Sequence, residues 1–167
     1  MTLPRPDPDA APLRSSSEAV PHDLIELLFF AYRDFVGDPD RILADYGFGR
    51  AHHRVLHFVQ RRPGLTIAEL LDILQITKQS LNRVLKELVE KGYIEQRTGR
   101  QDKRQRHLHT TATGQDLALR LVRLQAKRIN RALASVGPEA AATAAQYLSA
   151  LIDPSEQPKV NRLLGKP

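Results

Sequence analysis

The chain has no cysteine and no long apolar run. Without cysteine it can form no disulfide, which fits a reducing cytoplasm. A helix that crosses a membrane needs about 18 or more consecutive apolar residues, and no segment reaches that length. We therefore expect a cytoplasmic protein without a membrane span.

The motifs that bind nucleotides or support catalysis are also missing. The sequence contains no P-loop and no Gly-x-Gly-x-x-Gly run. No nucleophile stands beside a base, and the spacing of the titratable residues supports no acid–base pair. We therefore expect a protein that is not an enzyme and that needs no cofactor.

Both ends of the chain differ in composition from its middle. Residues 1–20 contain four prolines, three consecutive serines and no apolar h-region, so they predict a disordered tail and not a signal peptide. Residues 154–167 predict a flexible C-terminal tail. Residues 21–153 are expected to form one domain, since 41% hydrophobic residues suffice for a core.

Residues 66–92 have the pattern of two helices separated by a tight turn. Thr66 and Glu69 fit a capping box at the start of the first helix. Thr77 is suited to cap the second helix, which Gly92 closes. Apolar residues at i, i+3, i+4 and i+7 give the second helix one buried stripe, formed by Leu81, Val84, Leu85 and Leu88.

A basic hairpin follows the second helix. Residues 93–97 and 106–111 are strand-like runs on either side of a charged loop. Between residues 77 and 106 there are nine lysines and arginines against four acidic residues, so most of the net charge of +6 lies here. The sequence thus predicts an all-α fold with a small β-hairpin wing (α+β). This is a winged helix-turn-helix whose DNA-binding lobe spans about residues 49–111.

The polar face of the second helix and the wing loop hold the candidate DNA-binding residues. Such side chains can hydrogen-bond to base edges and phosphates. Residues i and i+2 of an extended segment share a face, so we expect Asp102 to orient Arg104. The candidates are Thr77, Lys78, Gln79, Ser80, Asn82, Arg83 and Lys86 on the helix, and Arg100, Asp102, Lys103 and Arg104 on the wing. A winged helix used only for protein contacts is the alternative.

Helices at both ends of the domain carry more apolar surface than one small core can cover. Residues 23–36 are apolar almost all round, and helical patterns over 111–135 and 139–152 also leave apolar faces. We therefore expect dimerisation helices over about residues 22–37 and 112–153. The candidate contact residues are Leu24, Leu27, Leu28, Tyr147, Leu148 and Leu151. The alternative is a monomer with a large helical core.

Three histidines lie on a helix expected over residues 49–61. His53 and His57 are at i and i+4, a spacing that can hold a metal ion, and with His52 they allow a metal-sensing regulator of the same fold. The sequence places no carboxylate beside them. Histidines that are partly buried or solvated are the simpler interpretation, and we assign no metal site.

The wing residues resemble a signature of the MarR family of bacterial transcription regulators. In that signature an Asp-x-Arg tip, here residues 102–104, precedes a returning strand and a helix-capping threonine, here Thr111, with Gly114 after it. Residues 65–70 and 85–94 also resemble family segments, and the resemblance extends over about residues 23–152. The chain departs from the family at Thr110, where leucine is usual. Residues 78–80 resemble a less common start of the recognition helix, which leaves the operator sequence open.

The resemblance implies a homodimeric regulator that is joined by its terminal helices. Each copy would place its second helix in a major groove of a pseudo-palindromic, double-stranded DNA operator. Arg104 would lie against the backbone or in the adjacent minor groove. Family members often bind a small-molecule effector between the dimer helices and the DNA-binding lobe, so we expect a ligand-responsive regulator. One branch of the family senses peroxide through cysteine, which this chain lacks.

Overall fold

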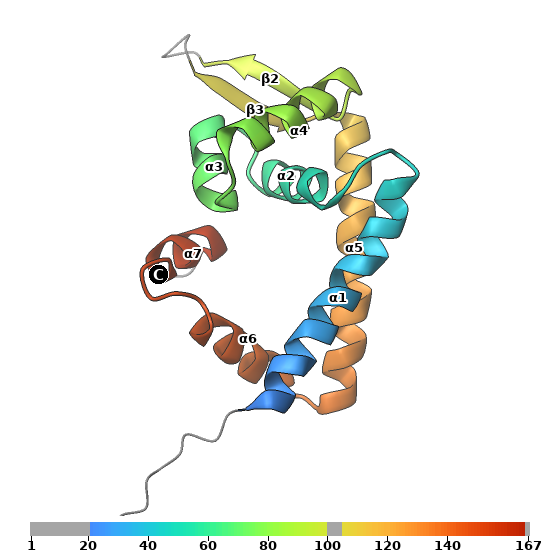
Figure 1. Ribbon diagram of the computed structural model, residues 1–167, viewed down its shortest axis with the longest axis vertical. Helices are drawn as coiled ribbons and strands as arrows, with labels where there is room; N and C mark the ends of the chain where they lie inside the picture. Colours follow the sequence, from blue (N-terminus) through green and yellow to red (C-terminus); the bar gives the residue numbers. More distant parts are fainter. Residues whose placement is uncertain (1–20, 100–104, 166–167) are drawn as a thin grey trace, which may run out of the picture. The chain divides into compact units, whose positions relative to one another are not determined.

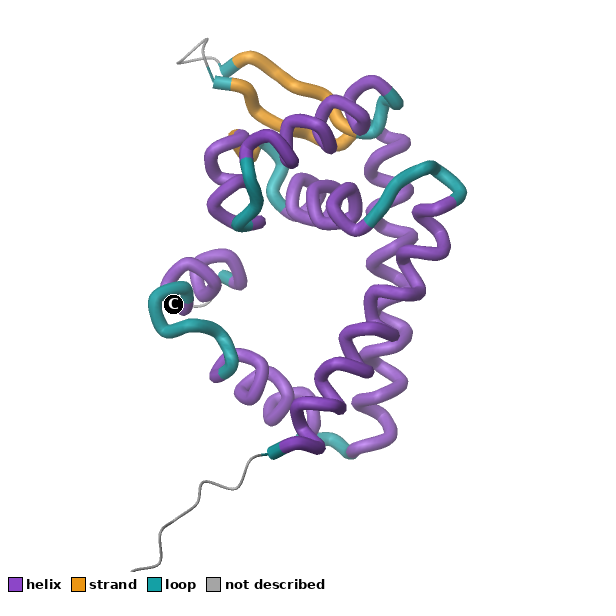
Figure 2. Tube along the Cα trace, in the orientation of Figure 1, coloured by secondary structure: helices purple, strands orange, loops and turns teal. Residues whose placement is uncertain are grey.

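The computed structural model describes residues 21–99 and 105–165. The chain divides into two compact units at the bond between Arg33 and Asp34, inside the first helix, and each unit is described by itself. The elements (Figures 1 and 2) are α1 (His22–Ala44), α2 (Arg50–Arg61), β1 (Leu65–Thr66), α3 (Ile67–Leu74), α4 (Lys78–Glu90), β2 (Ile94–Thr98), β3 (Arg106–Thr110), α5 (Ala112–Val136), α6 (Ala140–Ala150) and α7 (Gln157–Leu164).

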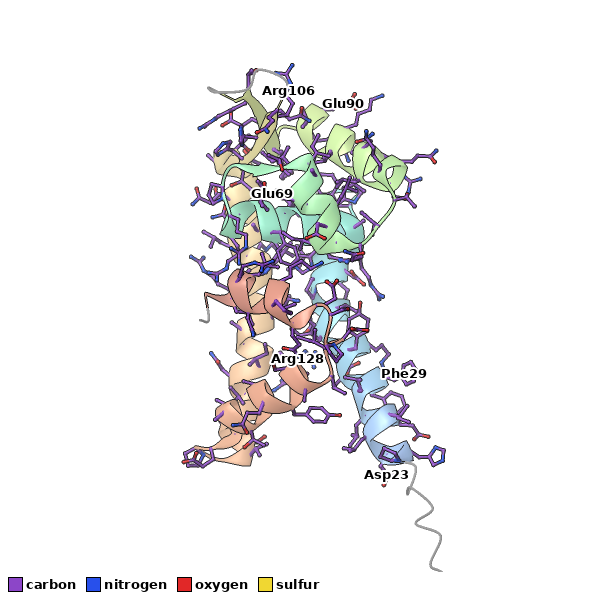
Figure 3. All side chains as sticks on the ribbon, turned by 90° about the vertical axis from the view of Figure 1, so that its left-hand side faces the viewer. Asp23, Phe29, Glu69, Glu90, Arg106 and Arg128 are labelled. Carbon is purple, nitrogen blue, oxygen red and sulfur yellow. The ribbon has the colours of Figure 1, made fainter. Side chains whose placement is uncertain are left out.

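The described part of the first unit is the N-terminal half of α1. Its apolar side chains are exposed, and Phe29, at 71% exposure, projects away from the helix (Figure 3). The guanidinium of Arg33 lies 5.0 Å from the centroid of the Phe30 ring, a cation–π contact. An apolar helix with this exposure offers surface that can be buried against a partner.

The core of the second unit is built around α2. This helix contributes Val55, Leu56 and Val59, all fully buried, and it contacts α3, α4, α5 and the sheet. The surrounding elements add further buried side chains, among them Leu43 of α1, Leu70 of α3, Leu81 and Leu88 of α4, Leu108 of β3 and Leu121 of α5. The helix pair and the sheet are therefore fixed to one common support.

The three strands form an antiparallel sheet in the order β1-β3-β2. Between β2 and β3 the pairing runs from Ile94 with Thr110 to Thr98 with Arg106, which confirms the predicted hairpin. The two-residue strand β1 was not predicted. It pairs with β3, which is far away along the chain, and makes β3 the central strand.

The chain turns tightly from β3 into α5. Thr111 donates its backbone N–H to the carbonyl of Tyr93 and its hydroxyl to the carbonyl of Gly92. The same hydroxyl oxygen accepts the N–H of Gly114, so Thr111 caps α5 as predicted. A Cβ atom on Gly114 would lie 1.9 Å from the Tyr93 oxygen, so only glycine fits at this position.

Two predicted boundaries are wrong. The expected tail over residues 154–167 contains the helix α7, which has proline in its first turn and half-buried Val160 and Leu163 on one face. The first helix does not end near residue 37 but continues through Pro39 to Ala44, because Val36, Pro39 and Leu43 are buried there. Within residues 21–99 and 105–165, no helix combines the length and apolar character that crossing a membrane requires.

Candidate nucleic-acid interface

The helix pair α3 and α4 is set up by local hydrogen bonds that the sequence predicted. Thr66 and Glu69 form the expected capping box, in which the Glu69 carboxylate accepts from both the N–H and the hydroxyl of Thr66 at 2.8 Å. These bonds hold the pKa of Glu69 below its usual value. Gln75 adopts a left-handed conformation at φ 51° and ends α3, and Thr77 caps α4 by accepting the N–H of Ser80. The turn therefore spans only residues 75–77.

Helix α4 has one buried and one exposed face. The predicted stripe of Leu81, Val84, Leu85 and Leu88 is confirmed, with every side chain at most 3% exposed. Opposite it, Lys78, Gln79, Asn82, Arg83 and Lys86 are all exposed, as is the cap Thr77, and Ser80 is half-buried. The helix thus presents a continuous row of hydrogen-bond donors and acceptors to solvent.

A buried histidine links α4 to the central helix. The Nδ1 atom of His52 accepts the N–H of Gly49 at 3.1 Å, so the proton of the neutral ring lies on Nε2. This Nε2 atom is 2.9 Å from a carboxylate oxygen of Glu87, to which it donates. The ring also stacks on Phe48 with centroids 4.7 Å apart. The orientation of α4 is therefore tied to α2 by a polar contact as well as by the core.

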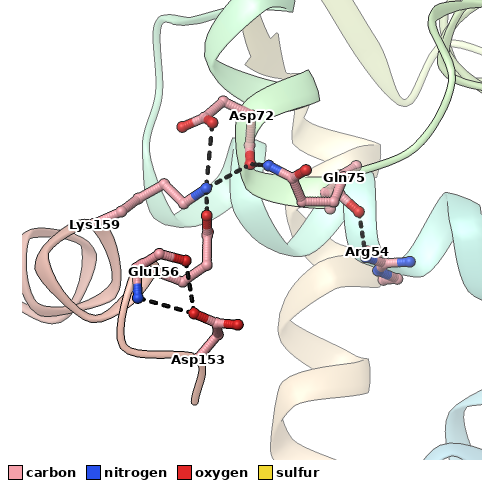
Figure 4. Close-up of polar contacts among 8 residues, drawn as sticks. Arg54, Asp72, Gln75, Asp153, Glu156 and Lys159 are labelled. Atoms are coloured by element: carbon pink, nitrogen blue, oxygen red, sulfur yellow. Dashed lines mark hydrogen bonds and ion pairs between the residues drawn. The ribbon is translucent and has the colours of Figure 1, made fainter.

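The C-terminal end of α3 is also held from outside the helix. Arg54 of α2 donates to the carbonyl of Leu74 at 2.8 Å, and the side chain of Gln75 donates to the carbonyl of Asp72 at 2.7 Å (Figure 4). Carbonyls in the last turn of a helix lack partners within it and attract such donors. Both ends of the turn between α3 and α4 are thus restrained.

The wing strands add cations beside α4. Arg97 of β2 is exposed and pairs with Glu95. Arg106, which is labelled in Figure 3, is exposed at the start of β3. The N–H of Gly99 donates to the carbonyl of Gln105 at 3.0 Å, which continues the hairpin beyond the strands. The predicted tip residues Arg100, Asp102, Lys103 and Arg104 lie outside the described residues.

The histidines predicted as metal candidates are half-buried on α2. Burial lowers the pKa of His53, and the neighbouring His57 lowers it further. Burial also lowers the pKa of His57, assisted by Arg61. Among residues 21–99 and 105–165 there is no group of three potential ligands that could hold a metal ion.

Three features of the site were missed in the sequence. The role of His52 was hidden because its partner Glu87 is 35 residues away, and Arg54 likewise acts on a carbonyl 20 residues away. Arg97 and Arg106 could have been found, because they flank the charged loop within strands that were predicted.

The predicted dimerisation residues are all exposed. Leu24, Leu27 and Leu28 of α1 are between 46% and 61% exposed, and Tyr147, Leu148 and Leu151 at the end of the chain are between 44% and 55% exposed. Six large apolar side chains exposed on these helices are more than a surface that faces only water usually carries.

Helices α3 and α4 are joined by a tight turn, and the β2–β3 hairpin of the three-stranded sheet lies beside α4. This arrangement defines a winged helix-turn-helix protein. The sequence model of the MarR family matches residues 46–105. The chain is 51% identical over 131 residues to the HTH-type transcriptional regulator PetP of Rhodobacter capsulatus, covering 78% of this chain and 79% of that protein. The chain belongs to the MarR family of transcriptional regulators, a family that is not a class of enzymes.

Solved structures agree on the fold. The chain superposes on FabT of Streptococcus pneumoniae, solved in complex with DNA, with a TM-score of 0.70 at 20% identity, over 78% of this chain and 93% of that one. A mutant MarR from E. coli complexed with operator DNA gives a TM-score of 0.62 at 21% identity, over 78% and 94% of the two chains. The predicted fold class, including the terminal helices outside the lobe, is confirmed.

Proposed function

We propose that the chain is a cytoplasmic homodimer that binds a pseudo-palindromic DNA operator and releases it in response to a small molecule. The observation that carries the DNA-binding part is the geometry of α4, whose five polar side chains at Lys78, Gln79, Asn82, Arg83 and Lys86 are exposed while its apolar stripe is buried. A helix of this kind, next to a basic hairpin, can enter a major groove while the hairpin meets the backbone or minor groove.

The residues divide into two roles. Asn82 and Arg83 lie in the first half of α4 and are proposed to read base edges, whereas Lys78 and Lys86 meet phosphates. Lys86 lies 3.8 Å from Glu90, an exposed pair that DNA phosphate can displace at little cost. Arg100, Lys103 and Arg104 of the wing would add phosphate or minor-groove contacts, with Asp102 orienting Arg104.

Homodimerisation is supported by the exposed apolar residues of α1 and by Tyr147, Leu148 and Leu151 at the end of α6. Two copies related by a two-fold axis present two α4 helices, and the operator should then share that symmetry. The effector part rests on family membership, which places the ligand between the dimer helices and the DNA-binding lobe. An open groove of about 670 Å³ between α4 and β2, lined by Asn82, Lys86, Val89 and Gln96 among others, is a second candidate site within the lobe. A ligand there would compete directly with DNA for Asn82 and Lys86.

Selection of bound fragments from random double-stranded DNA tests the proposal. We expect enriched fragments with a dyad and half-sites about 10 bp apart, or a small multiple of that. Enriched fragments without a dyad would contradict the proposal that the chain binds DNA as a two-fold dimer. Retention of no fragment at low salt would favour a winged helix used only for protein contacts.

A further inference from the structure

The C-terminal helix α7 docks on α3, the first helix of the helix-turn-helix. The Nζ atom of Lys159 lies 3.1 Å from the carbonyl oxygen of Asp72 and 3.2 Å from its carboxylate (Figure 4). Lys159 also pairs with Glu156, the N-cap residue of α7. Its side chain is 17% exposed, much less than is usual for a surface lysine. The lysine is thus engaged by two acidic groups and one backbone carbonyl.

The position of this contact on α3 has a physical reason. Helix α3 has only eight residues and no basic residue in its last turn, so its C-terminal carbonyls have no cation of their own. Isolated helices of this length are not stable in water and depend on tertiary contacts. Arg54 of α2 supplies one cation at this end, and Lys159 of α7 supplies the second.

The rest of the contact is incomplete. Val160 and Leu163 of α7 are only half-buried. A groove of about 300 Å³ remains between the two segments, lined by Leu65, Ile73, Leu163 and the polar side chains around them. A docking surface that is largely polar and not closely packed can be released without disrupting the core.

We propose that α7 is a releasable brace, which docks through Lys159 on the C-terminal end of α3 and so stabilises the turn that positions α4. When α7 is docked, the last turn of α3 and residues 75–77 are held in place. When it is released, this end of α3 opens more often, and α4 loses part of its preorganisation for DNA. The second consequence rests on the proposed function, and the first does not.

Hydrogen exchange of the full-length chain tests the docking. Lys159→Gln removes the charge while keeping most of the side chain, and the exposed Lys127→Gln on α5 is the control with the same change in net charge. We expect Lys159→Gln to speed exchange over residues 71–77 by about two- to tenfold, the range for the loss of one ordinary hydrogen bond at a partly exposed site. Asp72→Asn should also speed exchange over these residues, but by less. Lys159→Arg keeps the charge and should retain the protection of the parent chain.

Exchange of the core segment 117–121 must stay unchanged, which distinguishes local release from unfolding. Protection of residues 71–77 that is equal in the parent, Lys159→Gln and Asp72→Asn would overturn the brace. Additive effects of the two substitutions in the double variant would also overturn it, because partners in one contact must show coupling.

The effect on DNA is measured with one selected fragment at fixed salt. We expect Lys159→Gln to weaken binding by about two- to tenfold relative to Lys127→Gln. Faster exchange with unchanged DNA affinity would overturn the link between α7 and DNA binding and leave the docking standing. A parent chain that binds no DNA would overturn the proposed function instead, and the exchange result would still decide whether α7 docks.

Discussion

At the scale of single residues, Arg83 carries the sharpest test of base recognition. It is exposed on the polar face of α4, and its planar guanidinium suits bidentate contacts. Arg83→Ala should cost about 1–3 kcal/mol on a selected site and relax the preference at one position. Titration by fluorescence anisotropy on selected and random fragments measures both effects. The exposed Arg131→Ala on α5 controls for net charge, and an equal loss on random DNA would make Arg83 a phosphate contact.

Gly114 is a second residue whose chemistry is fixed by its surroundings. Gly114→Ala would force a methyl group to within 1.9 Å of the Tyr93 oxygen, a backbone atom that cannot move cheaply. We expect a loss of about 1–3 kcal/mol or more in the free energy of unfolding. Gly37→Ala, at a helical glycine with only an ordinary contact at 3.9 Å, is the matched control and should stabilise α1. Equal melting temperatures for the two variants would show that the contact at Gly114 is relieved.

Among the elements, the wing can be tested for one question: whether Asp102 orients Arg104, or whether the charges of the wing loop act independently of one another. If Asp102 orients Arg104, Asp102→Asn should weaken DNA binding even though it removes a negative charge from a surface that faces DNA. If the charges act independently, the same substitution should tighten binding. Affinity across a salt series decides between them, with Arg104→Ala expected to lower the salt slope by about one phosphate contact.

The elements whose signals are local in the sequence were predictable, and those that depend on distant contacts were not. Helix α4 and the capping box at Thr66 were predictable because their signals lie within a few residues of each other. Strand β1 was not, since its two residues become a strand only by pairing with β3. Helix α7 was missed because its apolar face is short and its composition is polar. The support of α4 by His52 likewise depends on a contact that only the fold creates.

For the molecule as a whole, the proposed dimer is the property to test first, because recognition of a two-fold operator would depend on it. Leu148→Glu replaces a side chain that is 55% exposed, so the fold of one chain should tolerate it while an apolar interface should not. Light scattering during size exclusion should then report a monomer, and affinity for a two-fold site should fall steeply because only one half-site is engaged. Leu164→Glu, at a leucine that is 60% exposed on α7, is the control. A parent chain that is itself monomeric at micromolar concentration would contradict the dimer.

The junction at Thr111 has a consequence for the engineering of new specificity. Thr111 bonds to Tyr93 and Gly92 and caps α5, and Gly114 leaves no space there. The base of the hairpin is therefore fixed by these bonds, and we expect the chain beyond the bond from Gly99 to Gln105 to tolerate changes in length better than the base does. Libraries that insert or graft sequence between residues 99 and 105 should keep the register of everything below. An insertion of one residue between positions 93 and 94 would instead shift β2 by one place and turn its inward side chains outward. An insertion between positions 110 and 114 would disrupt the bonds of Thr111 and its cap on α5.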